Sequence, residues 1–379
     1  MKKPLLSIAI ATKNREKYCI ASIQSILNYN NDLLEIVVAD NSATNEILKF
    51  VEATNSPQIK YVYDNSEIPF IENFNRAVNM TTGEYVIMIG DDDSILPFAF
   101  EMAVWAKENG ADTISSKQPV EYYWPEARDI YPTGYLSIPI QEKGMIKIDV
   151  QKQLDKVVKN GMQLYLLYNL PMTYHGIVRK EILNEIKAKT GHFYGGLTPD
   201  IYSCVALSCL VKNHYVVNQP ISIAGVCPSS GSAQNIKGGH SGSFEDIPHL
   251  KNKPDYIWNA LVPRYYSVNT IWAESALRAL TELNQTELIK KFNPYILIAQ
   301  ATINNRKFIP EIMSVEHENY RVLHHISKLE YAFNLLKAYS TIVKNKLSFL
   351  YKQKTTNTKF FNKHGVEDIQ QVVDIYNTI

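Results

Sequence analysis

The stretch Thr82-Gly83-Glu84-Tyr85-Val86-Ile87-Met88-Ile89-Gly90-Asp91-Asp92-Asp93 indicates the fold class of this chain. Its β-branched and apolar residues end abruptly at three consecutive carboxylates. Such an apolar run is typical of a strand that is buried on both faces, as in a parallel sheet. Ligands of open α/β sheets bind just beyond the carboxyl ends of strands, and the three aspartates follow such an end.

Three adjacent carboxylates repel one another, so we expect another group to offset their charge. A hard divalent cation prefers oxygen ligands, and phosphate oxygens can complete its coordination shell. The plainer interpretation is a solvated acidic turn, followed by a helix that starts near Pro97. The triplet by itself leaves both interpretations open.

Composition and length restrict the class of protein. The chain has 379 residues and a formal net charge of +1, which argues against a nucleic-acid-binding protein. The four cysteines lack paired zinc-ligand spacing, so we expect buried thiols in a reducing compartment. A strand follows the first two lysines too soon for a signal peptide, and no run of eighteen apolar residues predicts a membrane-spanning helix. The expected location is therefore cytoplasmic.

Strands and helices alternate along the first 120 residues, which predicts a mostly parallel sheet with helices on both faces. Leu5–Ala11 and Glu35–Ala39 are two further expected strands, and Asp40 follows the second of them. Asp40 and Asp91–Asp93 are thus expected to face one crevice. No glycine-rich phosphate loop follows the first strand, so carboxylates and a metal would have to hold a nucleotide.

The alternation lapses between Tyr122 and Gly161, where we expect an excursion over the surface that contacts substrate. Farther on, Asp200 precedes the apolar helix Ile201–Val211, either as a functional carboxylate or as a plain helix cap. The polar segment Pro228–Ser243 is rich in glycine and could close over a phosphate. We expect a catalytic domain over residues 1–250, with a nucleotide-binding half (1–120) and an acceptor half (121–250).

Residues 251–379 are expected to be a mainly α-helical region, with helices at Tyr256–Leu283, Gln285–Asn305 and Glu318–Lys352. Between Glu330 and Glu367 there is no acidic residue, while lysines alternate with apolar and aromatic residues. Such a helix can lie on an anionic membrane surface, or it can pack on its own domain or on a second subunit. All three interpretations stay open at this point.

Five motifs of the first 120 residues, in this order and spacing, resemble family 2 glycosyltransferases with the GT-A fold, a Rossmann-like α/β fold. They are Ala11-Thr12-Lys13-Asn14-Arg15, Val37-Val38-Ala39-Asp40-Asn41-Ser42, Asn73-Phe74-Asn75-Arg76-Ala77, Gly83-Glu84-Tyr85 and Asp91-Asp92-Asp93. The chain departs from the family in two places. Gly90 stands where many relatives have an earlier Asp, and Pro199 replaces a Glu that often precedes the catalytic carboxylate.

The resemblance implies an inverting transfer of a sugar from a nucleoside diphosphate sugar, usually a UDP-sugar. The nucleotide-sugar-binding residues that it implies are Thr12, Asn14, Arg15, Asp40, Asn41, Arg76, Asp91 and Asp92. It also implies that Asp93 binds Mg²⁺ or Mn²⁺, that His240 either approaches this metal or is a loop histidine, and that Asp200 is the general base. Such a base typically contributes about 10²–10⁴-fold to the rate.

The acceptor implied by the resemblance is a hydroxyl of a glycan or a lipid-linked glycan, in the synthesis of a cell-surface polysaccharide. Contact with the inner face of the membrane and a homo-oligomer are both compatible with the basic helix. One alternative function is a sugar-1-phosphate nucleotidyltransferase, which usually has a glycine-rich loop where this chain has Ala11–Arg15. Another is a non-catalytic protein that binds sugar nucleotides.

Overall fold

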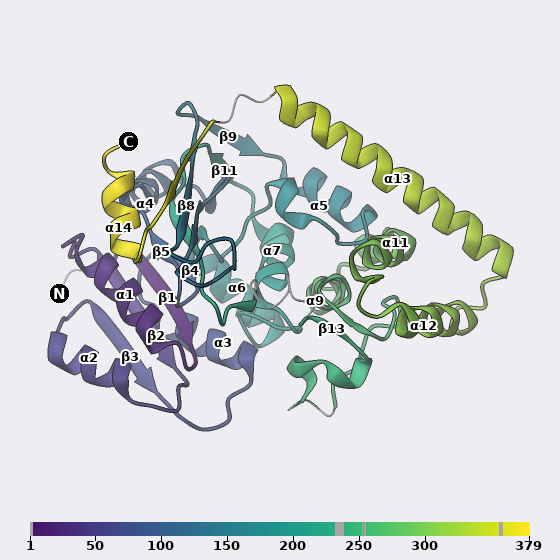
Figure 1. Ribbon diagram of the computed structural model, residues 1–379, viewed down its shortest axis with the longest axis horizontal. Helices are drawn as coiled ribbons and strands as arrows, with labels where there is room; N and C mark the ends of the chain where they lie inside the picture. The colour runs from purple at the N-terminus through teal and green to yellow at the C-terminus, as the bar shows by residue number, and fades with distance from the viewer. Residues whose placement is uncertain (1–2, 232–238, 252, 254, 356–358) are drawn as a thin grey trace.

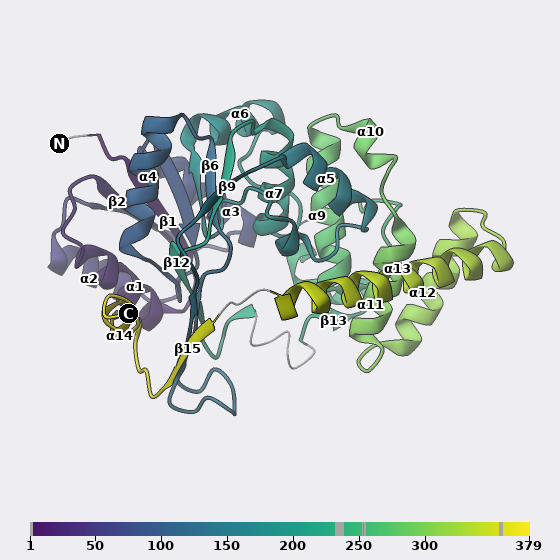
Figure 2. The same cartoon turned by 90° about the horizontal axis from the view of Figure 1, so that it is seen from above.

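The computed structural model describes residues 3–231, 239–251, 253, 255–355 and 359–379, with the backbone alone for 351–355. Figure 1 and Figure 2 show a sheet-containing body, with a group of helices to one side of it. Residues 232–238 of the predicted phosphate-closing segment Pro228–Ser243 lie outside the described residues.

Within the described residues, eight strands form the central sheet in the order β3-β2-β1-β4-β10-β6-β11-β9. Their bounds are β1 Leu6–Thr12, β2 Leu34–Asp40, β3 Ile59–Tyr63, β4 Tyr85–Ile89, β6 Thr113–Ser116, β9 Met145–Ile148, β10 Gly176–Arg179 and β11 His214–Val217. Strands β3, β2, β1 and β4 are parallel, whereas β10 is antiparallel to β4 and β6, and β9 is antiparallel to β11. The mostly parallel sheet predicted from the sequence is confirmed.

Both faces of the central sheet are covered. Every residue of β1, β2 and β4 is buried, as their apolar runs predict. Leu6, Ile8 and Ile10 join one core cluster and Ala9 and Ala11 the other, because successive side chains of a strand point to opposite faces. The first cluster includes α1 (Glu16–Leu27), α2 (Glu46–Thr54) and α4 (Pro97–Asn109). The second includes α3 (Phe70–Met80), α5 (Val150–Lys159), α6 (Lys180–Thr190), α7 (Pro199–Leu210) and α9 (Val268–Glu282).

A second sheet of five strands lies within the described residues, in the order β15-β8-β7-β12-β5. Its strands are β5 Ser94–Ile95, β7 Val120–Tyr123, β8 Tyr135–Ile140, β12 Ser222–Val226 and β15 Lys359–His364. Strand β4 of the central sheet ends just before the carboxylate triplet, and β5 of the second sheet begins directly after it. The triplet therefore joins the two sheets.

The stretch 122–161 is not the surface excursion that we expected, because it contains the second half of β7 and all of β8, β9 and α5. Leu136 and Ile138 of β8 are buried in the core of the second sheet. The tyrosines that suggest a loop in the sequence pack on one another instead, and the Tyr131 and Tyr135 ring centroids lie 4.2 Å apart. Aromatic residues favour strands when aromatic side chains on neighbouring segments pack against them. Which tyrosines pack together is not visible in the sequence.

The chain beyond residue 255 is mainly helical, as predicted, but the boundaries differ. Helix α9 starts at Val268 rather than at Tyr256, because Ser267 caps it by accepting a hydrogen bond from the Thr270 amide. The expected helix Gln285–Asn305 is divided at Asn293, whose side chain caps α11 before Pro294. The remaining bounds are α10 Thr286–Ile289, α11 Pro294–Asn305, α12 Pro310–Leu323 and α13 Lys328–Thr355. None of the described helices is long and apolar enough to cross a membrane.

The last residues return to the amino-terminal half. Strand β15 pairs antiparallel with β8, and α14 (Ile369–Tyr376) lies beside α1 in Figure 1. Val366, Ile369, Val372 and Val373 are buried in the same cluster as the core residues of the second sheet. The last part of the region 251–379 therefore forms a strand and a short helix that belong to the second sheet and its core.

Candidate active site

The predicted nucleotide-binding residues lie at the carboxyl edge of the parallel strands. Thr12 and Asp40 are the last residues of β1 and β2 and are directly paired in the sheet. Ile10 of β1 pairs with Ile89, the last residue of β4, so the triplet after β4 lies at the same edge. The sheet thereby brings together side chains that are far apart in the sequence.

Arg15 lies between the first two aspartates of the triplet. Its Nη2 is 2.9 Å from Asp91 Oδ1 and its Nη1 is 3.4 Å from Asp92 Oδ2. Asp91 Oδ2 accepts a hydrogen bond of 2.8 Å from the Thr12 hydroxyl. Burial raises the pKa of Asp91 and of Asp92, and the adjacent guanidinium opposes that rise. Arg15 thus offsets part of the charge that a bound cation was expected to offset.

Asp93 is held by four hydrogen-bonding groups. Its Oδ2 is 2.6 Å from the Gly90 amide nitrogen, 2.8 Å from the Tyr174 hydroxyl and 3.2 Å from His175 Nε2. Its Oδ1 accepts a 2.7 Å hydrogen bond from the Gly225 amide. Burial acts to raise the pKa of Asp93, but His175 and the two amides lower it overall. This carboxylate is ionised and fully hydrogen-bonded.

Asp92 differs from its neighbours in having one oxygen that is less engaged. Its Oδ2 accepts a 3.0 Å hydrogen bond from the Cys227 amide and faces Arg15. Its Oδ1 receives no N–H or O–H donor from the residues that the structure describes. Of the two final aspartates, Asp92 therefore keeps more capacity for a further ligand.

Two glycines allow the close packing around the triplet. A Cβ atom at Gly225 would lie 1.8 Å from the Asp92 carbonyl oxygen, so β12 can approach only with glycine at this position. A Cβ atom at Gly90 would lie 2.7 Å from the Tyr174 hydroxyl and 2.9 Å from Asp93 Oδ2. An aspartate at position 90, which many relatives have, would collide with the groups that hold Asp93.

Two residues predicted to bind the nucleoside, Asp40 and Asn41, are hydrogen-bonded to neighbouring protein groups. Asp40 accepts hydrogen bonds from the Ser42 amide (2.8 Å) and from the Tyr61 hydroxyl (2.7 Å). Asn41 donates to the carbonyl oxygens of Asp64 (2.6 Å) and Ser66 (2.7 Å), so it fixes the segment that follows β3.

Arg76 and Asn14 also lie at this edge. Arg76 Nη1 donates to Asn73 Oδ1 at 3.2 Å, while Asn73 itself donates to the carbonyl oxygens of Thr12 and Ala39. Asn14 Oδ1 accepts a 2.8 Å hydrogen bond from the Ala43 amide. These contacts connect the ends of β1 and β2, and they leave Arg76 with 19% of its side chain exposed.

Asp200 lies in the first turn of α7, after the cap residue Thr198. Its Oδ2 accepts a 2.8 Å hydrogen bond from the Tyr165 hydroxyl, whereas its Oδ1 is buried and has no hydrogen-bond partner. Burial and the charge of Asp200 raise the pKa of Tyr165 well above its usual range, so Tyr165 stays protonated and donates. An unsatisfied buried carboxylate oxygen is costly, which favours a role with a further ligand.

Two tyrosines hold the carboxylates of Asp93 and Asp200. Tyr174 donates to Asp93, and Tyr165 donates to Asp200. Tyr165 belongs to the core cluster against which Tyr174 packs. The sequence motifs indicated neither tyrosine.

The hydrogen bonds of His240 go to residues outside the triplet. Its Nδ1 is 2.5 Å from the Tyr266 hydroxyl, and its Nε2 is 3.2 Å from the Gly231 carbonyl oxygen. Among the described residues, no contact joins His240 to the triplet. The histidine that does contact the triplet is His175, which also lies 3.0 Å from the Ser222 hydroxyl through Nδ1.

A divalent cation at the triplet would have few protein ligands. Across the described part of the chain, no group of three or more His, Cys, Asp or Glu side chains is arranged to hold a metal. Mg²⁺ is usually bound by one or two carboxylates together with substrate phosphates, and it keeps several waters. The less engaged oxygen of Asp92, next to Asp91 and Asp93, fits that mode of binding.

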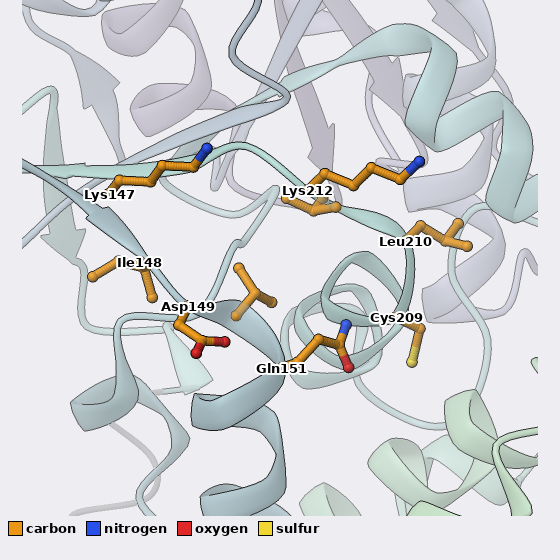
Figure 3. A pocket seen from close by; sticks show the side chains of 9 residues that line it. Lys147, Ile148, Asp149, Gln151, Cys209, Leu210 and Lys212 are labelled. Atoms are coloured by element: carbon orange, nitrogen blue, oxygen red, sulfur yellow. The ribbon is translucent and has the colours of Figure 1, made fainter.

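Two cavities formed by described residues are lined by side chains outside the triplet. Figure 3 shows one of about 620 Å³ at the opposite edge of the sheet, lined by Lys147, Ile148, Asp149, Val150, Gln151, Cys209, Leu210, Val211 and Lys212. Another, of about 440 Å³, lies between the start of α3, the segment 192–196 and α9. None of the predicted site residues lines either cavity.

Part of this sequence matches known proteins. Residues 7–161 match the family model described as Glycosyl transferase family 2. An uncharacterized glycosyltransferase of Methanocaldococcus jannaschii is 33% identical over 117 residues, which are 30% of this chain and 40% of the relative. The GalNAc(5)-diNAcBac-PP-undecaprenol beta-1,3-glucosyltransferase of Campylobacter jejuni is 28% identical over 195 residues, which are 51% of this chain and 57% of the relative. The matched part of the chain thus spans about half the length of these relatives, or less.

Among solved structures, S. aureus TarS (residues 1–349) in complex with UDP-GlcNAc has a TM-score of 0.46 at 14% identity, covering 88% of this chain and 79% of that one. The family match is the finding that identifies the segment: residues 7–161 form a family 2 glycosyltransferase domain. This confirms the resemblance, and the observed sheet confirms the α/β fold class that the sequence predicted.

Proposed function

We propose that this protein is an inverting glycosyltransferase that moves a sugar from a nucleoside diphosphate sugar, a UDP-sugar, to an acceptor hydroxyl. The observation that carries the proposal is the buried, unpartnered Oδ1 of Asp200. Its neighbour Tyr165 belongs to the core cluster against which Tyr174, the hydrogen-bond donor to Asp93, packs. The carboxylates after β4 suit a diphosphate with its cation, and Asp200 suits an acceptor hydroxyl that must lose a proton.

In the proposed reaction, Asp200 Oδ1 accepts the proton of the acceptor hydroxyl. The hydroxyl oxygen then bonds to the anomeric carbon of the sugar as the bond to the nucleoside diphosphate breaks, which inverts the configuration. Tyr165 fixes the orientation of Asp200 by donating to Oδ2, so that Oδ1 is the oxygen left for the proton.

The donor would lie along the carboxyl edge of β1, β2 and β4. Thr12, Asn14, Arg15, Asp40, Asn41 and Arg76 surround the proposed nucleoside and ribose position. Asp92, together with Asp93, would hold Mg²⁺ or Mn²⁺, and a bound cation would supply Lewis-acid stabilisation of the leaving diphosphate. The contacts of Asp93 favour Asp92 as the direct ligand, with Asp93 fixing the position of its neighbour.

The proposed acceptor is a glycan or a lipid-linked glycan in the synthesis of a cell-surface polysaccharide. The name of the C. jejuni relative supports this class, since it gives a glycan on undecaprenyl diphosphate as what that enzyme acts on.

The test compares Asp200→Asn with the unmodified protein. We expect turnover to fall by about 10²–10⁴-fold, as for loss of a general base, while donor affinity measured by calorimetry stays unchanged. Turnover is measured as nucleoside diphosphate released from a panel of nucleotide sugars with Mn²⁺. Pyrophosphate release from a nucleoside triphosphate and a sugar phosphate would instead indicate a nucleotidyltransferase.

Asp149→Asn is the matched control, because Asp149 also lies at the start of a helix and caps α5 far from the triplet. The control should keep turnover near that of the unmodified protein. If Asp200→Asn behaves like this control, Asp200 is not the base.

A further inference from the structure

Helix α13 carries two separate apolar faces. Figure 1 and Figure 2 show it as a long helix along the outside of the molecule, next to α11. Its inner face packs on Ile296 and Ala299 of α11 through Leu335, Ala338 and Ile342. Packing within its own domain is therefore already provided by this inner face.

The second apolar face is exposed. Its side chains recur at spacings of three, four and seven residues, which places them in one stripe along the helix. Leu329, Leu336 and Leu347 are 85%, 68% and 63% exposed. The complete stripe is Leu329, Phe333, Leu336, Val343, Leu347 and Leu350.

Lysines border this stripe on both sides. At about 100° of rotation per residue, Lys337 and Lys344 lie along one side of the stripe, in the row that Glu330 begins. Lys328 and Lys346 lie along the other side, toward the face that packs on α11. The sequence has no acidic residue between Glu330 and Glu367. The exposed face of α13 is thus an apolar stripe bordered by four lysines and one glutamate.

We propose that this exposed face of α13 docks on an anionic bilayer surface, with the helix axis parallel to the membrane. The apolar side chains would enter the boundary between headgroups and acyl chains, and both lysine rows would meet anionic headgroups. A second copy of the chain fits less well, because the same surface brings four lysines and only Glu330 as an acidic side chain to the contact. The proposal does not depend on the proposed transferase activity.

The test is flotation of the full chain with vesicles of phosphatidylcholine alone or of phosphatidylcholine mixed with phosphatidylglycerol. We expect binding to the mixed vesicles only, with release at high salt because the lysine contribution is screened. The double variant Leu336→Gln/Leu347→Gln should bind the mixed vesicles at least about tenfold more weakly, since the apolar part of the contact is lost.

The control variant is Ile130→Gln/Ile146→Gln, which removes two exposed isoleucines (61% and 56% exposed) that lie outside α13. It should bind vesicles like the unmodified chain, and circular dichroism should show that both variants are folded. Absence of flotation by the unmodified chain, or equal loss in the two variants, would overturn the proposal. So would a dimer, measured by light scattering without lipid, that only the α13 variant loses, because this face would then join two copies.

Discussion

Gly225 determines how closely β12 approaches the carboxylate triplet. We expect Gly225→Ala to destabilise the fold by about 1–3 kcal/mol, because the new methyl group would overlap the Asp92 carbonyl oxygen. Displacement of Asp92 should also weaken donor binding. Urea denaturation and calorimetric titration with a nucleoside diphosphate measure the two effects.

Gly231→Ala is the matched control for this substitution, since the nearest atom to its Cβ would be His240 Nε2 at 3.6 Å. The control should leave donor affinity unchanged. Equal donor affinity in Gly225→Ala would mean that the backbone of Asp92 does not have to stay in place for binding.

His214 predicts a pH dependence of stability. It is fully buried on β11, accepts from the Thr113 hydroxyl at Nδ1 and donates from Nε2 to the Asn169 carbonyl oxygen. Burial lowers the pKa of His214 from 6.5 to about 4, so the unfolded chain binds a proton at a higher pH than the folded chain does. The stabilisation is complete above pH 6.5 and is lost as the pH falls toward 4, at about 1.4 kcal/mol per pH unit.

Melting temperatures measured across this pH range test the prediction, with His214→Gln for comparison. The variant should be less stable at neutral pH and should show a shallower decline on acidification. An identical decline in both proteins would assign the pH dependence to other groups, such as His249 and His317, whose pKa values burial also lowers to about 4.

The residues of the site differ in how far the sequence could predict them. Thr12, Asp40 and the triplet directly follow apolar strands, so the position of each in the sheet follows from local pattern. His175 and Cys227 reach the triplet from distant parts of the chain, and neither belongs to a motif. His175 could have been suspected because it is a titratable residue next to an apolar strand. Its left-handed backbone conformation (φ 58°), which forms a tight turn there, is not visible in the sequence.

At the level of elements, the order of the first strands and helices was predictable because β1, β2 and β4 are buried on both faces and therefore consist of apolar runs. The antiparallel position of β10 between β4 and β6 was not predictable, because nothing in its residues distinguishes it from a parallel strand. Its position depends on pairing with both β4 and β6, which is a tertiary contact. This insertion is also what carries Tyr174 and His175 to Asp93.

Helix α14 should contribute strongly to stability although it lies near the end of the chain. Ile369 is fully buried against the second sheet, so Ile369→Ala should cost about 2–5 kcal/mol in the free energy of unfolding. The control Ile379→Ala removes a side chain that is 56% exposed and should change stability by less than about 0.5 kcal/mol. Urea denaturation compares the two, and equal effects would mean that α14 is only loosely attached.

For the whole molecule, the proposed cation site predicts a response to metal removal. Nucleoside diphosphate affinity should fall when a chelator removes divalent ions and should return when Mn²⁺ is added. Asp92→Asn should abolish this dependence, whereas Asp93→Asn should mainly lower stability, since it disturbs four hydrogen-bonding groups. Equal affinity with and without chelator would contradict the proposed role of the metal.

The return of β15 and α14 also has a consequence for folding during synthesis. Until these residues leave the ribosome, β8 has an unpaired edge and the apolar side chains of Tyr122 and Leu136 lack their cover. Roughly 220 residues separate β8 from β15, so at about 5–20 residues per second the edge stays open for roughly 10–45 s. An open strand edge is a template for pairing with other chains, so a nascent chain of this protein would be a natural client of chaperones that cover such edges.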